Sequence, residues 1–75
     1  MIKPSEKQRF ELLKIQHELK KVAISIGSMH SFWDFIFDID AMLKGKESII
    51  NDPNELILAA KKTLNKWLRA NRYKT

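Results

Sequence analysis

Residues 31–44 read SFWDFIFDIDAMLK, and no other part of the chain is so apolar or so acidic. Eight large apolar side chains lie within little more than three helical turns, and three aspartates interrupt them. On a helical wheel most of the apolar side chains share one face, whereas Trp33 and Phe37, four residues apart, form a separate aromatic patch. The segment therefore predicts a largely buried helix around which the rest of the chain packs.

Two longer segments flank this helix, and their apolar residues recur at gaps of three and four. In residues 5–26 these are Leu12, Ile15, Leu19, Val22, Ala23 and Ile26, with Phe10 and Leu13 widening the stripe. In residues 53–71 they are Leu56, Ile57, Ala60, Leu64, Trp67 and Leu68. This spacing is typical of amphipathic helices. The sequence predicts an all-α, antiparallel three-helix bundle with helices at about 5–26, 31–44 and 53–71, in a single domain, 1–75.

Capping signals mark the starts of the two long helices. Ser5 and Gln8 have the spacing of a capping box, in which each side chain bonds the backbone amide of the other residue. Asp52 is expected to cap the last helix, Pro53 suits its first position, and Glu55 would complete a second box. Both helix starts are therefore defined by local sequence.

The remaining boundaries depend on glycine and serine. The expected signals are Gly27 and Gly45 as helix stops, and Ser28 or Ser31 as the start of the middle helix. Residues 46–51 are predicted to form a loop or a single helical turn. Ile49 and Ile50 are expected to anchor this segment to the core.

Length and composition limit the class of protein. A chain of 75 residues buries only about 60% of the surface that its unfolded form exposes, so a partner subunit would add needed burial. Cysteine is absent, which excludes disulfides and thiolate metal sites. The N-terminal residues lack the apolar run of a signal peptide, and the longest apolar stretch is shorter than the roughly 20 residues of a membrane span. We expect a soluble, cytoplasmic protein.

The net charge of +5 is unevenly distributed. Six basic and three acidic residues give residues 1–30 a charge of +3, and two basic and five acidic residues give residues 31–52 a charge of −3. Six basic residues and one acidic residue give residues 53–75 a charge of +5. The acidic middle could complement its basic neighbours within the bundle, or the basic C-terminal helix could face an acidic partner.

The aromatic patch is the leading candidate site. A bundle of three helices covers one face of the middle helix, so Trp33 and Phe37 need additional cover. Either the long helices bury both patches, or Trp33 and Phe37 bind a second copy or another protein, with Asp34 and Asp38 at the rim. We predict a small, non-enzymatic protein-interaction module, such as an inhibitor, adaptor or assembly factor, that self-associates through its second helix.

A basic stripe on the last helix gives the main alternative. Its residues are Lys62, Lys66, Arg69 and Arg72. They could follow nucleic-acid phosphates, with Tyr73 stacking on a base, or they could simply be solvated. A helix-turn-helix is excluded, because its recognition helix would be the acidic segment. A minor alternative is a membrane-surface protein using Trp67 and Leu68, or an immunity-type protein, although bacteriocin immunity proteins share no motif with this chain.

Catalysis and metal binding have little support. His30 and Asp34 are four residues apart, which is more typical of a contact at a helix start than of a catalytic dyad. His30, Asp34 and Asp38 could face one another along one helix, but a usable metal site needs ligands from separate elements. We therefore predict no enzymatic activity, no metal and no cofactor.

Overall fold

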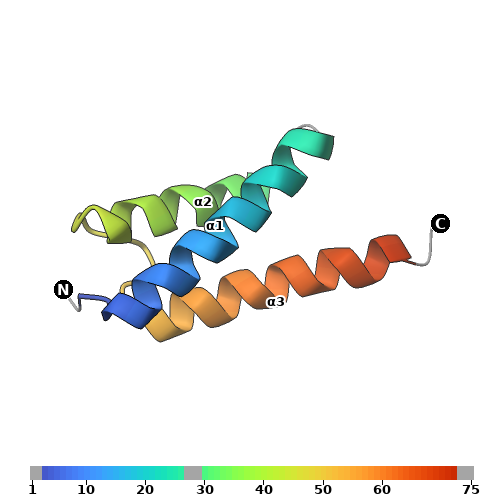
Figure 1. Cartoon of the computed structure of the whole chain (residues 1–75). Helices are drawn as coiled ribbons and strands as arrows, with labels where there is room; N and C mark the ends of the chain where they lie inside the picture. Colours follow the sequence, from blue (N-terminus) through green and yellow to red (C-terminus); the bar gives the residue numbers. More distant parts are fainter. Residues whose placement is uncertain (1–2, 27–29, 73–75) are drawn as a thin grey trace.

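Three helices make up the described part of the chain. The computed structural model describes residues 3–26 and 30–72, and the side chains of Ile26, His30, Asn71 and Arg72 lie outside that description. The helices are α1 (Glu6–Ile26), α2 (His30–Leu43) and α3 (Pro53–Arg72), and each packs against the other two. α2 runs antiparallel to both long helices (Figure 1). The predicted all-α three-helix bundle is confirmed.

The N-terminal ends of α1 and α3 are capped and joined to each other. The Ser5 amide donates to Gln8 Oε1 at 2.7 Å, and the Gln8 amide donates to Ser5 Oγ at 3.2 Å, which confirms the capping box. Gln8 Nε2 also donates to Asn54 Oδ1 at 2.9 Å. Asp52 Oδ1 accepts from the Asn54 amide at 3.0 Å, as expected of an N-cap. Glu55 forms no corresponding bond to Asp52 among the described residues, so the second box lacks one arm.

α2 ends in a Schellman motif at Gly45, which confirms the predicted stop. Gly45 has φ +74°, its amide donates to the Met42 carbonyl at 3.2 Å, and the Lys46 amide donates to the Ala41 carbonyl at 2.8 Å. These bonds satisfy carbonyls that the last helical turn leaves without intrahelical partners. They also turn the chain toward the loop that leads to α3.

The start of α2 differs from the prediction. The helix begins at His30, so Ser31 lies inside the first turn and is not its N-cap. An N-cap must precede the first helical residue, and Ser31 follows it. The expected roles of Gly27 and Ser28 concern residues outside the described ranges.

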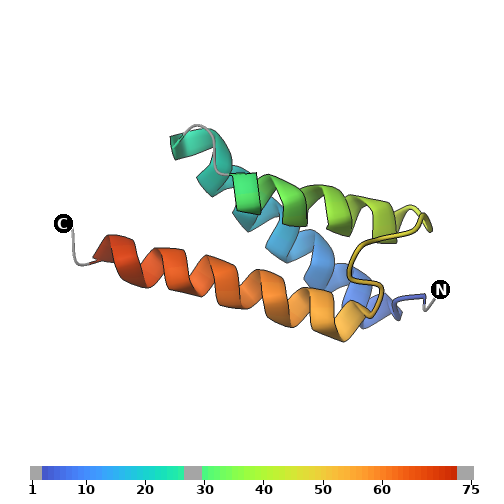
Figure 2. The same cartoon turned by 180° about the vertical axis from the view of Figure 1, so that it is seen from behind.

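The core lies along one face of each helix. Its buried residues are Leu12, Ile15, Leu19 and Ala23 of α1, Phe32, Ile36, Ile39 and Met42 of α2, and Leu56, Ile57 and Ala60 of α3. Val22, Trp33, Phe35, Leu43, Ile50, Leu64 and Trp67 pack against it while partly exposed. Phe32 and Trp67 meet edge to face, with ring centroids 6.3 Å apart. No residue of α3 beyond Ala60 is fully buried among those described, and the last turns of α3 extend away from the other helices (Figure 2).

Four residues expected in the core or next to it are exposed. Leu68 is 44% exposed, because it lies in the part of α3 that extends away from the other helices (Figure 2). Phe10 and Leu13 are 72% and 53% exposed, because they lie outside the buried face of α1, about 160° and about 100° round the helix from Leu12. Ile49 is 91% exposed, and only Ile50 of the loop packs against the core. The chain bends at these two isoleucines, and only the second one directs its side chain at the core.

Replacing Gly45 with alanine should lower the free energy of unfolding by about 1 kcal/mol, because an L-residue is strained at positive φ. A Cβ at this position would meet no atom within 4 Å, so the cost comes from the backbone alone. Gly45→Asn should cost less, because asparagine tolerates the left-handed conformation. Urea denaturation followed by circular dichroism measures both, and equal costs would contradict this explanation.

Candidate protein-binding surface

The aromatic patch is formed as the spacing predicts. Trp33 and Phe37 follow each other by one turn of α2, and their ring centroids are 5.9 Å apart with a 31° angle between planes. Trp33 packs partly against the core, whereas Phe37 is 64% exposed. On the helical wheel Phe37 lies nearly opposite the core position Phe32. The long helices therefore cover part of Trp33 but leave most of Phe37 in solvent.

The two aspartates assigned to the rim of the patch have different surroundings. Asp34 is exposed and has no hydrogen-bond or ion-pair partner among the described residues. Asp38 is buried, and its Oδ1 and Oδ2 accept from the amides of Ile49 and Ile50 at 2.6 and 3.0 Å. Asp38 therefore holds the α2–α3 loop against α2. Only Asp34 remains free at the edge of the patch.

Sequence reasoning missed two polar contacts that position α2. Gln16 is buried on α1, and its Nε2 donates to the Ile36 carbonyl of α2 at 3.1 Å. Arg9 Nη1 donates to the Leu43 carbonyl at 3.3 Å, at the negative end of the α2 dipole. Gln16 lies between the apolar positions of the α1 stripe, and this placement was the available signal that its amide is used inside the bundle.

The basic surface of α3 is partly assembled. Lys62, Asn65, Lys66 and Arg69 line one shallow depression on the outside of this helix. Arg72, the fourth cation of the predicted stripe, has a side chain outside the described set. Lys61 is the other described lysine of α3, and its Nζ lies 3.9 Å from Glu11 Oε2 of α1. Three of the four predicted cations are thus exposed on one side of α3.

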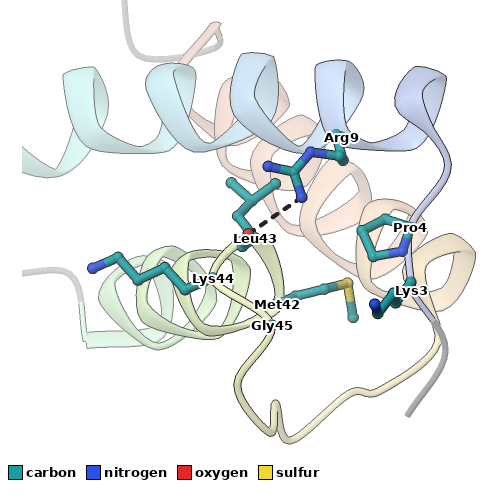
Figure 3. Close-up of a pocket in the computed structure, with 7 residues that line it drawn as sticks. All are labelled: Lys3, Pro4, Arg9, Met42, Leu43, Lys44 and Gly45. Atoms are coloured by element: carbon teal, nitrogen blue, oxygen red, sulfur yellow. Dashed lines mark hydrogen bonds between the residues drawn. The ribbon is translucent and has the colours of Figure 1, made fainter.

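A second group of cations surrounds the end of α2 (Figure 3). Lys3, Arg9 and Lys44 line a depression whose apolar part is formed by Pro4, Met42 and Leu43. Arg9 reaches the Leu43 carbonyl, whereas the Lys44 side chain points away from Lys3 and Arg9. Lys44 Nζ instead lies 3.0 Å from Asp40. Because the three cations do not converge, this depression does not form an anion site.

Among the side chains that the structure describes, which do not include that of His30, no three histidine, aspartate or glutamate groups lie together as metal ligands would. None of the helices described is both long enough and apolar enough to cross a bilayer.

Comparison with protein-family models, with curated proteins and with solved structures found no match to this chain.

Replacing Asp38 with alanine should lower the free energy of unfolding by about 2 kcal/mol, because two loop amides lose a charged acceptor. Asp34→Ala is the matched control. It removes an exposed carboxylate from the same helix and should change stability by less than about 0.5 kcal/mol. Chemical denaturation of both variants provides the comparison, and equal effects would show that the Asp38 bonds contribute little.

Proposed function

We propose that this chain is a small, non-enzymatic protein-interaction module that self-associates through the aromatic patch of α2, in the manner of an inhibitor, adaptor or assembly factor. The observation that carries the proposal is the exposure of Phe37 beside Trp33, on the side of α2 that faces away from the core. Aromatic side chains of this kind are enriched among the residues that dominate binding energy. We also propose that the protein is cytoplasmic, because a chain without cysteine fits a reducing compartment.

Covering the aromatic patch would contribute substantially to the free energy of binding. A buried aromatic side chain removes 150–250 Å² from water, so covering the exposed part of Phe37 alone would contribute roughly 2–3 kcal/mol. Trp33 supports the Phe37 ring from one side and limits its motion, which lowers the entropic cost of binding. Asp34, exposed at the edge, favours a partner surface that carries basic residues. A 75-residue bundle also gains stability from any partner that binds only the folded state.

Phe37→Asp should raise the dissociation constant for self-association about tenfold or more, because a carboxylate replaces the exposed ring at the centre of the patch. Leu58→Asp is the matched control, since Leu58 on α3 is 66% exposed and so closely resembles Phe37 in accessibility. Sedimentation equilibrium over a range of concentrations measures both variants. If both variants associate as the unsubstituted chain does, the aromatic patch is not the binding site.

Nucleic-acid association through α3 is the second candidate function. Its support is the common depression lined by Lys62, Asn65, Lys66 and Arg69, in which three cations could contact successive phosphates.

The second candidate predicts that exchanging Lys62 and Lys66 for glutamine weakens binding to duplex or single-stranded DNA and lowers the slope of log K against log salt by about 1.5 to 2. The exchange of Lys3 and Lys7 for glutamine is the control, because it removes equal charge at the other end of the sequence. Fluorescence anisotropy at several salt concentrations provides the slopes. Equal slopes for the two double variants would exclude α3 as the phosphate-binding surface.

A further inference from the structure

α1 carries three exposed apolar side chains, together with one histidine, on its solvent side. Phe10, Leu13, His17 and Ile24 are all exposed, and we call these four residues the α1 outer stripe. At 100° per residue they fall within an arc of about 60°, nearly opposite the buried stripe of the same helix. Phe10, Leu13 and His17 also line one shallow depression together with Lys14. Neighbouring exposed apolar side chains of this kind are suited to contact another molecule.

The contacts of α1 show which way the α1 outer stripe faces. Gln16 marks the side toward α2, through its bond to Ile36. Glu11 marks the side toward α3, because it lies 3.9 Å from Lys61. Going round the helix from Glu11 through the core, one passes Gln16 and then reaches the α1 outer stripe. The stripe therefore lies next to α2, on the side away from α3.

The contacts of α2 likewise show which way the aromatic patch faces. On α2, Ile36 marks the side toward α1, and Phe32 marks the side toward α3 through its contact with Trp67. Going round from Phe32, one passes Ile36 and then reaches Trp33 and Phe37. The patch thus also faces away from α3. α1 and α2 form a layer with α3 on one side, and the other side carries the two exposed apolar surfaces next to each other.

From this arrangement we infer that the occupant of this face is a second copy of the chain, packed by a two-fold axis so that α1 of each copy covers α2 of the other. The inference rests on the proposed function and names its partner. In the resulting dimer the α1–α2 layers of the two copies would pack face to face, with each α3 outside. In such a symmetric contact the α1 outer stripe of one copy meets the aromatic patch of the other twice.

Charge decides between the two ways of packing this face on itself. α1 carries five basic and three acidic residues, whereas α2 carries three aspartates and no lysine or arginine. A two-fold axis across the helices would place α1 on α1 and bring lysine toward lysine. An axis along the helices places α1 on α2. It brings Lys14 and Lys21, at the edge of α1 turned away from α2, toward Asp34 at the far edge of the partner's helix.

The positions of the residues along the helix axes also bring the two apolar surfaces opposite each other. A two-fold axis along the helices leaves the position of each residue along that axis unchanged. The bond from Gln16 to the Ile36 carbonyl shows which residues of α1 and α2 share the same position. Phe37 would then face the partner's α1 close to Leu13 and His17. With helices about 10 Å wide and α2 about 21 Å long, the two copies would bury on the order of 1,000 Å². Because this is near the lower limit of specific interfaces, the dimer should dissociate on dilution.

Complementation between two variants tests the arrangement. Leu13→Asp and Phe37→Asp should each raise the dimer dissociation constant about tenfold or more, while Leu58→Asp leaves it unchanged. In an equimolar mixture of the first two, one of the two α1–α2 contacts of a heterodimer is intact, whereas neither homodimer has an intact contact. The mixture should therefore associate more tightly than either variant alone in sedimentation equilibrium. Circular dichroism and thermal melting confirm that each variant is folded.

Other outcomes separate this inference from the proposed function. If Phe37→Asp weakens association but Leu13→Asp does not, or if mixing restores nothing, the α1 outer stripe is not the partner surface and only this inference fails. If Phe37→Asp has no effect, the proposed function fails as well. A chain that stays monomeric at millimolar concentration yet binds phosphatidylglycerol vesicles in a manner that Leu13→Asp abolishes would replace the second copy with an anionic lipid surface.

Discussion

The fold depends on burial of one side of α2 between two longer helices. Phe32, Ile36, Ile39 and Met42 are each 2% exposed or less, although α2 has only 14 residues. Burying side chains of this size contributes about 1.5–3 kcal/mol each, so this one surface is a large part of what can stabilise a domain of 75 residues. Both long helices must therefore pack against the same short helix.

Polar groups fix the position of α2 within this packing. Apolar contacts alone would allow α2 to slide or rotate between its neighbours, because they have little directional preference. The Gln16 side chain bonds a backbone carbonyl in the middle of α2, and Asp38 bonds two amides of the loop that follows it. A buried amide or carboxylate that loses its partner is costly, so these bonds favour one arrangement of the helices over its neighbours.

The same packing explains why two apolar surfaces remain outside. Three helices enclose one core, and α3 covers only one side of the layer that α1 and α2 form. None of the helices that the structure describes covers the other side, where Phe10, Leu13 and Phe37 are exposed. A basic helix next to an acidic one makes that side self-complementary in charge. The proposed interaction module would use such a surface, whereas a monomer stabilised only by its core would have no need of it.

The sequence by itself determined the local features of this protein. The capping box at Ser5, the N-cap at Asp52 and the stop at Gly45 follow from residues within one turn of each other, and periodicity then indicates three helices. Which side of a helix is covered depends on its neighbours. For this reason only the tertiary structure showed that Phe10 and Leu13 face solvent, and that Asp38 holds a loop while Asp34 stays exposed. Periodicity divides a helix into faces, but the placement of the other helices decides which face becomes core and which remains available for a partner.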